Sequence, residues 1–444
     1  MTANGTDRLL SRGGRRILGN TGWLIAERVL QMGLGLLIGV WVARYLGREK
    51  FGDLSCAIAL VALVAPFSTL GVQSIAVRDI VRNPASRGEI LGTSLILRLV
   101  GGVAGCVAVL VAAAIVYPTQ PIVRLMAAIV SIGLLFRALE TIDTWFQAQV
   151  QSKYTVWAKT TAMIGSAGAK VWLILAGAPV VAFAWVTAAE VAVGSLALVL
   201  VYHIRGHRMR AWRFTSAKAS YLLGQSWPLI LSSVGATLNL EIDKVMLGRM
   251  VGSAEAGVYT AAAKLSESWF FIPLALAGSV FPAMIRSKEL GEKLYNQRMQ
   301  RLFDTMVWMA LAIAVVVSPL ARPIIGLLYG REYAAAAPIL KVHVWACLFT
   351  FMGAALSRWL VNEGLLTFSF TRHAFGAAAN IALNLFLIPR YGGLGAAFST
   401  LISYATAHWL ACFTSSSTRG AGVMMSLALV VPARTLFRLA GRRQ

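Results

Sequence analysis

Charged side chains are scarce in this sequence. Asp, Glu, Lys and Arg make up 13% of its 444 residues, about half of the roughly 25% that is usual in a soluble domain. Hydrophobic residues make up 58%, and the mean hydropathy is +0.70. Apolar runs of about 20 residues, the length that a helix needs to cross a bilayer core, recur along nearly the whole chain. The composition excludes an ordinary soluble domain and predicts an all-α, polytopic membrane protein.

Residues that bind metals or form disulfides are also few and scattered. The four cysteines, Cys56, Cys106, Cys347 and Cys412, fall inside apolar runs with neither metal-ligand spacing nor a disulfide pattern. The five histidines form no ligand cluster. The sequence also lacks a Walker A motif for ATP hydrolysis and a nucleophile–base pattern. We therefore expect no metal, no cofactor and no enzymatic activity.

The apolar runs predict about twelve membrane spans. They are expected at about residues 23–45, 53–76, 90–116, 122–147, 154–177, 181–202, 224–248, 257–284, 304–328, 338–361, 367–388 and 393–413. A polar stretch, His203–Ser220, lies between the first half of these spans and the second. This pattern predicts four segments. They are an N-terminal lobe at residues 1–202, a basic cytoplasmic connector at 203–220, a C-terminal lobe at 221–415 and a basic cytoplasmic tail at 416–444.

Basic residues outnumber acidic ones, and the net charge is +23. In a soluble protein this charge would indicate nucleic-acid binding. Here most Lys and Arg residues fall in short loops on one side of the spans, as in the connector. The positive-inside rule places that side, and both termini, in the cytoplasm. We expect the charge to fix topology and to contact anionic lipid headgroups, with no nucleic-acid partner. Arg286–Phe303 is expected to be a second basic segment, amphipathic and interfacial, and the short apolar run Val423–Val431 is also expected to be interfacial.

One sequence motif occurs twice. Arg44–Gly52 and Arg249–Gly257 share the spacing R-x-h-G-x-x-x-x-G, where h is apolar. A span with a proline near its middle follows each copy, Pro66 in the first and Pro273 in the second. The repetition indicates two copies of one membrane unit, and parallel repeats of this kind place a site between the two halves. Because a proline removes a backbone donor, we expect both helices to bend there and to act as hinges.

Polar residues recur inside the spans at helical spacing. A charge at mid-bilayer costs about 2.5–3.5 kcal/mol on insertion scales, so repeated contact with lipid is unfavourable and a water-filled cavity is the more economical explanation. Single residues have simpler alternatives, since Lys159 and Arg372 can snorkel and Lys264 can pair with Glu267. The candidate lumen bases are Arg28, Arg98, Arg137, Lys170, Lys244, Lys264 and Arg372. The acids expected to tune their field or carry a coupling proton are Glu27, Glu140, Asp143 and Asp243, and the expected polar lining is Asn239, Asn380 and Asn384.

A cationic or mixed lumen favours an anionic ligand. Guanidinium and ammonium groups bind phosphate through charge-assisted hydrogen bonds. Several of the acids lie within one turn of a base and can pair with it, whereas Arg98 and Lys170 have no acid close in sequence.

Several motifs resemble those of the Wzx-type polysaccharide-biosynthesis flippases, of the multidrug/oligosaccharidyl-lipid/polysaccharide superfamily. The likeness covers about residues 15–415. The motifs are Arg44–Gly52, similar to the family's first loop; Ile242–Gly248 with Gly257–Tyr259, similar to its seventh helix; Leu328–Tyr333 with Ala337–Leu340, similar to its ninth-to-tenth loop; and Asn384–Gly392 with Gly395–Ala397, similar to its eleventh-to-twelfth turn.

The resemblance implies a V-shaped bundle of two six-helix lobes, as in MATE exporters. It also implies alternating-access transport of an undecaprenyl-pyrophosphate-linked oligosaccharide from the cytoplasmic to the periplasmic leaflet of a bacterial inner membrane. H⁺ or Na⁺ and a polysaccharide polymerase are further candidate partners. A MATE-like drug exporter is an alternative, and its cationic substrates would favour unpaired carboxylates in the lumen. A lipid II-type flippase would need two extra spans that the sequence does not show, and a scaffold for polysaccharide synthesis would give the polar stripes no task.

Overall fold

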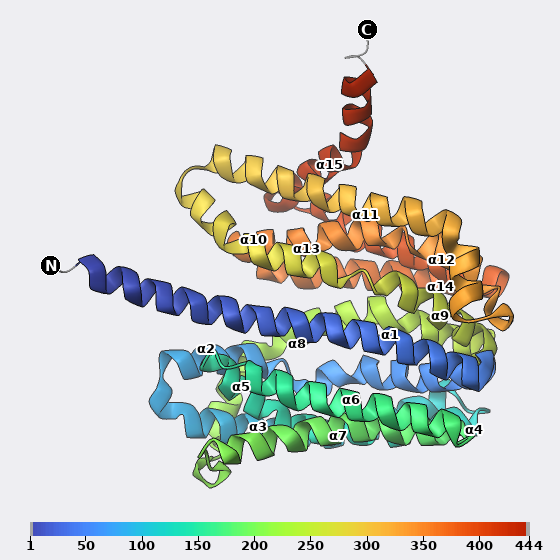
Figure 1. Cartoon of the computed structure of the whole chain (residues 1–444), viewed down its shortest axis with the longest axis horizontal. Coiled ribbons are helices and arrows are strands. Elements are labelled where there is room, and N and C mark those ends of the chain that lie inside the picture. The colour runs from blue at the N-terminus through green and yellow to red at the C-terminus, as the bar shows by residue number, and fades with distance from the viewer. Residues whose placement is uncertain (1–2, 441–444) are drawn as a thin grey trace. The chain divides into compact units, whose positions relative to one another are not determined.

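A computed structural model describes the backbone of residues 3–440, and the side chains of Trp23 and of residues 27–430 other than Pro282 and Leu366. Within that part every regular element is a helix, as Figure 1 shows. The α-helices are α1 (Ala3–Thr69), α2 (Val72–Arg82), α3 (Arg87–Val116), α4 (Pro121–Phe136), α5 (Thr141–Ala148), α6 (Lys153–Leu175), α7 (Val180–Ile204), α8 (Ser216–Met250), α9 (Ser253–Glu267), α10 (Phe271–Glu289), α11 (Glu292–Leu328), α12 (Ala336–His343), α13 (Ala346–Asn362), α14 (Leu366–His408) and α15 (Ser416–Ala440). The prediction of an all-α chain is confirmed.

The helices divide into two compact units. The first unit comprises residues 1–45 and 57–230, and the second comprises residues 46–56 and 231–444. These limits differ from the expected lobes, 1–202 and 221–415, in two places. The division falls inside α8, because that helix is continuous through residue 230. The segment 46–56, expected in the N-terminal lobe, makes its contacts in the second unit because Gly52 packs against Ser253.

Two long helices each contain a glycine with a left-handed backbone. In α1 this is Gly47, with φ 72°, and in α14 it is Gly392, with φ 54°. Glycine adopts positive φ without the steric cost that other residues meet. The apolar stretches around them, Glu27–Arg82 and Thr367–Thr414, have 56 and 48 residues, more than twice the roughly 20 that one crossing needs. Each stretch therefore corresponds to two of the expected spans.

Seven helices of the described part are long and apolar enough to cross a membrane, or eight if one bent pair counts as a span. The bent pair is Ser253–Phe281 with Ala283–Glu289. Helices α6 and α8 are also long enough to cross a membrane, but charged residues make them less apolar. Helix α6 carries Lys159 and Lys170, and α8 carries Asp243 beside two other charged residues. The chain is a polytopic membrane protein, and the number of twelve crossings stays a prediction.

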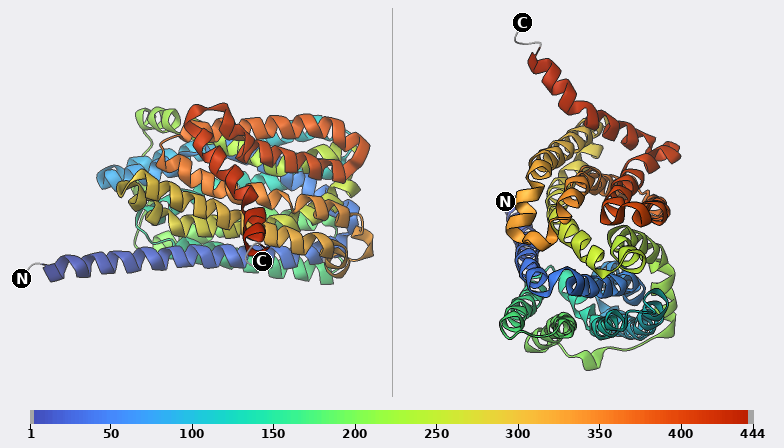
Figure 2. Two further views of the ribbon diagram at one scale, coloured as in Figure 1. Left: turned by 90° about the horizontal axis from the view of Figure 1, so that it is seen from above. Right: turned by 90° about the vertical axis from the view of Figure 1, so that its right-hand side faces the viewer.

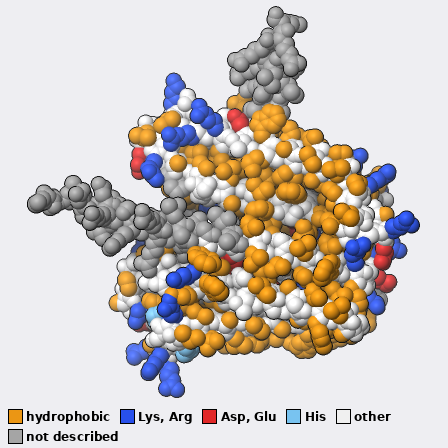
Figure 3. Space-filling view, in the orientation of Figure 1, with side chains coloured by type: hydrophobic (Ala, Val, Ile, Leu, Met, Phe, Trp, Pro, Cys, Tyr) orange, Lys and Arg blue, Asp and Glu red, His pale blue; other side chains and the backbone are white. Residues whose placement is uncertain are grey.

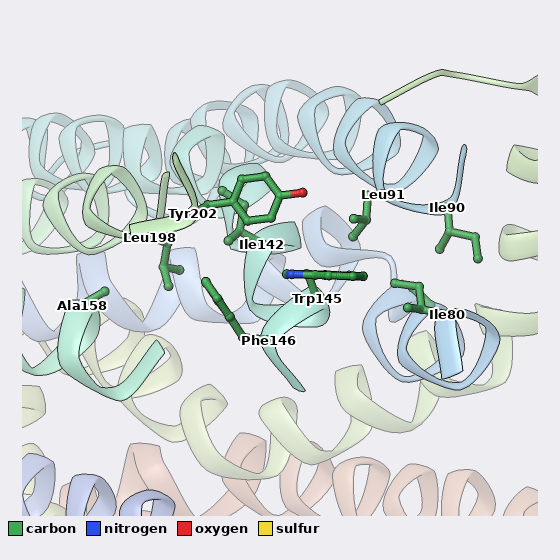
Figure 4. Close-up of a cluster of buried hydrophobic side chains, with 10 residues drawn as sticks. Ile80, Ile90, Leu91, Ile142, Trp145, Phe146, Ala158, Leu198 and Tyr202 are labelled. Carbon is green, nitrogen blue, oxygen red and sulfur yellow. The ribbon is translucent and has the colours of Figure 1, made fainter. Parts of the chain in front are cut away.

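In the first unit, α3, α4, α6 and α7 run side by side (Figure 1). Near one end of the unit, aromatic and aliphatic side chains form a buried cluster that includes Ile142, Trp145, Phe146 and Tyr202 (Figure 4). The connector is folded onto this cluster, since the Trp212 indole donates to the Tyr202 hydroxyl over 3.2 Å. The expected connector, 203–220, is thus a short strap between α7 and α8, and both helices extend into it.

The strap crosses the start of α3 at two glycines. The Arg213 N–H donates to the Gly88 carbonyl over 3.1 Å. A Cβ atom on Gly92 would lie 2.5 Å from the Arg213 backbone, so only glycine permits this approach.

In the second unit, α11, α13 and α14 run alongside one another (Figure 2). The two copies of the repeated motif meet in this unit. A Cβ atom on Gly52 would lie 1.7 Å from the Ser253 carbonyl oxygen, and one on Gly257 would lie 2.0 Å from the Arg48 carbonyl oxygen. The second glycines of the two motifs therefore allow two helices to cross with their backbones in contact.

The C-terminal tail, expected to be basic and interfacial, forms the helix α15 in the described part. This helix packs against α11 and buries Ala421, Met425 and Ala428. It is not among the helices that are apolar enough to span a membrane.

Both prolines lie beside a break in a span. Pro66 lies near the end of α1, and Leu70 and Gly71 follow it with φ of 55° and 58°. Pro273 is the third residue of α10, after a short break that follows α9. In the first turn of a helix a proline loses no intrahelical hydrogen bond. We expected Pro273 near the middle of its span, but it lies near the start of α10. Its role as a hinge stays a prediction.

Candidate functional site

The first unit contains a polar cavity of about 420 Å³ between α1, α6, α7 and the short 3₁₀ turn Arg137–Glu140. Its apolar lining includes Leu34, Ile38 and Met163. Its polar lining consists of Gln31, Arg137, Glu140, Lys159, Lys170 and Glu190, with Ser195 beside them. The structure thus brings together three residues expected from the sequence to form the lumen: Arg137, Glu140 and Lys170.

The charges in this cavity are partly paired. Lys170 Nζ lies 3.1 Å from Glu190 Oε2, and Ser166 donates to the same oxygen. Lys159 Nζ lies 3.4 Å from Asp143 Oδ2, just outside the lining. The lining holds three bases and two carboxylates, and the buried Asp143 behind it pairs with the third base, Lys159. Arg137 is the base of the lining that no ion pair among the described residues involves.

Asp143 is buried behind the cavity, where several side chains bond to its carboxylate, and it is not part of the lining. Only 5% of the residue is exposed. Its carboxylate accepts hydrogen bonds from the Thr155 hydroxyl at 2.7 Å, the Gln147 amide at 3.1 Å and the Gln73 amide at 3.4 Å. These bonds fix the carboxylate that pairs with Lys159. Asp143 therefore positions a lumen base, a role that its spacing along the helix did not reveal.

Arg98 and Arg28, two of the expected lumen bases, do not line this cavity. Arg98 is 3% exposed on α3 and donates to Gln73 over 3.5 Å, and its Nε has no partner. It is close enough to Glu140 and Asp143 to interact with them electrostatically. Arg28 is exposed on α1. Their part in a lumen stays a prediction.

Glu27 lies at the edge of the same region. It accepts a hydrogen bond from the Gln31 amide over 3.1 Å and interacts electrostatically with Lys159 and Asp143. Lys159, Glu190 and Gln31 were not among the residues predicted for the site. The helical spacing of Lys159 to Lys170 and of Gln31 to Glu27 was visible in the sequence, as was the position of Glu190 inside a span. The partner that each residue would meet was not visible.

A second polar cluster, the Asp243 network, lies inside the second unit. The Asp243 carboxylate is 1% exposed and accepts hydrogen bonds from the Tyr259 hydroxyl at 2.6 Å, the Asn384 amide at 2.6 Å and the Thr400 hydroxyl. Asn384 also donates to Asn380 over 2.9 Å. Among the described residues no Lys or Arg forms an ion pair with Asp243. The hydrogen-bond partners of this buried carboxylate are all neutral, so keeping it ionised costs free energy.

Lys244 and Lys264, on the neighbouring faces of α8 and α9, are held within the second unit. Lys244 is 6% exposed and its Nζ lies 2.9 Å from Glu241 Oε2, one turn away on the same helix. Lys264 Nζ lies 5.4 Å from the centre of the Phe51 ring. The expected assignment of both to substrate binding has no contact to support it here and stays a prediction.

Arg372 is buried inside the second unit and does not reach the interface. It is 2% exposed and bonds His408 Nδ1 at 2.6 Å and the Ser357 hydroxyl at 2.9 Å. The snorkelling alternative for Arg372 is therefore wrong. Asn239 bonds the carbonyl oxygens of Gly235 and His373, so it ties α8 to α14 and lies apart from the Asp243 network.

The described residues hold no group of three or more His, Cys, Asp or Glu side chains placed to bind a metal ion. The four cysteines are free thiols. The first unit presents ammonium and guanidinium groups in its cavity. The second unit holds the buried Asp243 carboxylate with neutral hydrogen-bond partners.

Comparison with known proteins places these features in a family. The family described as "Polysaccharide biosynthesis protein" matches residues 17–288, and the MatE family matches residues 228–386. The probable low-salt glycan biosynthesis flippase Agl15 of Haloferax volcanii is 22% identical over 234 residues, 47% of this chain and 48% of that protein. The probable flippase AglR of the same organism is 30% identical over 168 residues, 36% of this chain and 35% of that protein. The chain thus spans half or less of the length of these relatives.

Solved structures with the same fold include transporters of two kinds. An inward-facing multidrug resistance MATE family transporter of the MOP superfamily superposes with a TM-score of 0.70 at 16% identity, over 93% of this chain and 96% of that one. The lipid II flippase MurJ in an inward closed conformation has a TM-score of 0.72 at 14% identity, over 94% and 93%. At such identities these likenesses show the fold. The family match over residues 17–288, more than half of the chain, shows that this chain belongs to the polysaccharide biosynthesis protein family.

Proposed function

We propose that this protein is a flippase for a lipid-linked oligosaccharide. It would move an undecaprenyl-pyrophosphate-linked glycan from the cytoplasmic to the periplasmic leaflet of a bacterial inner membrane. The product would serve the synthesis of a surface polysaccharide, such as O-antigen, capsule or exopolysaccharide. Family membership supports a flippase, and two relatives are named as probable flippases, one of them for glycan biosynthesis. The observation that carries the proposal is the cavity of the first unit, where Arg137 has no ion-pair partner among the described residues and lies beside Lys159 and Lys170 in the lining.

The cavity suits a diphosphate because carboxylates pair with Lys159 and Lys170 but not with Arg137. Arg137 has no ion-pair partner among the described residues, so its guanidinium can donate several hydrogen bonds to phosphate oxygens. Lys170 is paired with Glu190, and an arriving phosphate would compete with that carboxylate for the ammonium group. Such competition keeps binding reversible, which transport requires. The negative charges of Glu140 and Glu190 would tune the electrostatic field that the substrate meets in the cavity.

Energy coupling would take place at the Asp243 network. A carboxylate surrounded by neutral donors in a dry interior favours binding a proton or a small cation. The hydroxyl of Thr400 and the side-chain oxygens of Asn380 and Asn384 are the groups that can share such a cation with Asp243. We propose that H⁺ or Na⁺ binding here biases alternating access, with the helix breaks beside Pro66 and Pro273 as hinges.

The second candidate is a MATE-like exporter of cationic drugs. The fold likeness to a multidrug transporter favours it, as does the unpaired carboxylate of Asp243. Arg137 in the first unit's cavity opposes it, because a guanidinium group without an ion-pair partner among the described residues would repel a cationic substrate. A lipid II-type flippase is a third candidate, favoured by the fold likeness to MurJ.

One reconstitution experiment separates the three candidates. The purified protein in lipid vesicles would be supplied with an undecaprenyl-pyrophosphate-linked oligosaccharide, with lipid II or with a cationic dye, under an imposed H⁺ or Na⁺ gradient. We expect movement of the oligosaccharide lipid across the bilayer and none of the dye. Transport of the dye with no movement of either lipid would overturn the proposal. Movement of lipid II alone would restrict the substrate to peptidoglycan precursors.

A further inference from the structure

A groove of about 290 Å³ runs between α10 and α11 in the second unit. Its lining is mostly apolar, with Leu276, Val280 and Met284 on α10 and Leu302 on α11. Two arginines of α11, Arg298 and Arg301, complete it. We call this feature the α10–α11 groove. It lies in neither the polar cavity of the first unit nor the Asp243 network.

The two arginines present an uncompensated positive charge to the groove. Arg298 is held in place, since its Nη1 donates to the Ser287 hydroxyl over 2.6 Å and to the Ala283 carbonyl over 3.4 Å. Arg301 is exposed, three residues further on, and its side chain makes no hydrogen bond or ion pair with the described residues. None of the groove-lining residues is acidic. The nearest acid along α11, Asp304, accepts a hydrogen bond from the Gln300 amide.

The groove has a polar end and an apolar end along α10. At 1.5 Å per residue, Leu276 lies about 12 Å along the helix axis from Met284. The last turn of α10 carries two further basic residues, Arg286 and Lys288, and Figure 3 shows basic side chains gathered over this end of the α10–α11 hairpin. The charge distribution predicts that this end faces the cytoplasm. The arginines then lie near the level of lipid headgroups, and Leu276 and Val280 lie deeper.

We propose that the α10–α11 groove binds the pyrophosphate and the first isoprenoid units of the lipid-linked substrate in the cytoplasmic leaflet, before translocation. This inference rests on the proposed function. Two guanidinium groups about one helical turn apart match two linked phosphates, each of which accepts charge-assisted hydrogen bonds. A single apolar channel matches a single polyisoprenoid chain. A glycerophospholipid matches less well, because it brings one singly charged phosphodiester and two tails.

The test is direct binding of undecaprenyl diphosphate, without sugar, to the purified full chain. Arg301→Gln removes one guanidinium from an exposed position, and Val280→Trp fills the groove. Arg286→Gln removes the same charge from an exposed position at the end of α10, outside the groove, and is the matched control. Loss of a charge-assisted contact should weaken binding by about tenfold in Arg301→Gln. We expect a similar loss or complete loss in Val280→Trp and an unchanged affinity in Arg286→Gln.

Phosphatidylglycerol and undecaprenyl monophosphate serve as competitors in the same assay. We expect neither to displace the diphosphate at equal concentration. Displacement by phosphatidylglycerol would overturn the groove as a substrate site and indicate a phospholipid contact instead. Equal losses of affinity in Arg301→Gln and Arg286→Gln would also overturn it, because general surface charge would then explain the binding.

The outcomes also distinguish this inference from the proposed function. If the wild-type chain binds and translocates the glycan lipid while Arg301→Gln and Val280→Trp are unaffected, only the groove proposal fails. If the wild-type chain neither binds the diphosphate nor moves the glycan lipid, the proposed function fails and takes the groove proposal with it.

Discussion

At the scale of single residues, burial separates side chains that looked equivalent in the sequence. Arg98, Arg137 and Arg372 each interrupt an apolar helix, yet Arg137 lines the cavity of the first unit while Arg98 and Arg372 are buried. Arg98 and Arg372 are enclosed by neighbouring helices, and each leaves its Nε without a partner. A buried guanidinium with incomplete hydrogen bonding is costly to retain. Arg98 and Arg372 are thus enclosed within their units, whereas Arg137 and Lys170 line the cavity of the first unit.

The first prediction concerns these two cavity bases. Arg137→Ala and Lys170→Ala should each reduce translocation by about tenfold or more, because a charge-assisted contact to phosphate is worth about 1.5–3 kcal/mol. Arg137→Lys should be nearly as harmful as alanine if the contact is bidentate. Complementation of surface-polysaccharide display measures the effect, with membrane levels checked by immunoblot.

The control for this experiment is Arg124→Ala. Arg124 is exposed on α4 and does not line the cavity, so its loss should leave display unchanged. Full display by both cavity variants at normal expression would contradict a cationic substrate site in the first unit.

The second prediction concerns Asp243. Asp243→Asn keeps the size of the side chain and removes its charge, so the hydrogen-bonded network can persist while ion binding is lost. We expect transport in vesicles to become insensitive to an imposed H⁺ or Na⁺ gradient. Asp304→Asn, on α11 and outside the network, is the control and should keep the wild-type response. An unchanged gradient dependence in Asp243→Asn would remove this residue from energy coupling.

At the scale of helices, glycines decide where the long elements turn and cross. Gly47 and Gly392 divide α1 and α14, because their positive φ is open to glycine at little cost. Gly52 and Gly257 act differently, since their backbones have ordinary φ but no room for a side chain. The repeated motif thus combines a turn at its first glycine with a close helix crossing at its second.

The third prediction tests this crossing. Gly52→Ala would place a Cβ atom 1.7 Å from the backbone oxygen of Ser253, and a backbone atom cannot move aside cheaply. We expect a loss of about 1–3 kcal/mol in stability from overpacking, seen as a lower Tm of the purified protein in detergent. Gly33→Ala in α1 is the matched control because nothing lies within 4 Å of its added Cβ. A Tm for Gly52→Ala equal to that of Gly33→Ala would show that the crossing can relax.

At the scale of the whole molecule, hydropathy and charge together describe a chain threaded through a membrane. Exposed apolar side chains, including Trp41, Val107, Trp185 and Leu200, cover the helices of the first unit. On a soluble protein so many would promote aggregation, but toward lipid they are favourable. Basic residues gather instead at the strap between α7 and α8 and at the α10–α11 turn. These two regions are expected on the cytoplasmic side.

The fourth prediction tests that topology by cysteine labelling. Ser216→Cys, at the start of α8, should react with an impermeant thiol reagent only from the cytoplasmic side. Val251→Cys, just after α8, should react only from the periplasmic side. Both positions are exposed, whereas the neighbouring Ser253 is buried and would label poorly. Labelling of both from one side would rule out a single crossing by α8 and with it the twelve-span topology.

The class of the protein, its helical content and the approximate positions of its spans could be predicted without coordinates. These properties depend on local features, namely the length of apolar runs and the placement of Lys and Arg in loops, and both are visible along the chain. The family resemblance likewise followed from short motifs at glycine turns. The helix stripes also identified Arg137 and Glu140 in one expected span, and Lys170 in the next, as candidates for a polar lumen.

Which charges meet could not be predicted, because it depends on contacts between distant segments. Lys170 pairs with Glu190 across two helices, and Asp243 meets Asn384 and Thr400 from the far end of the chain. Periodicity reports the face of a helix on which a residue lies, but not what packs against that face. For this reason only the packed structure separates the buried Arg98 and Arg372 from the cavity-lining Arg137. It also brings the two copies of the glycine motif into contact, since a close crossing requires both backbones to be in place.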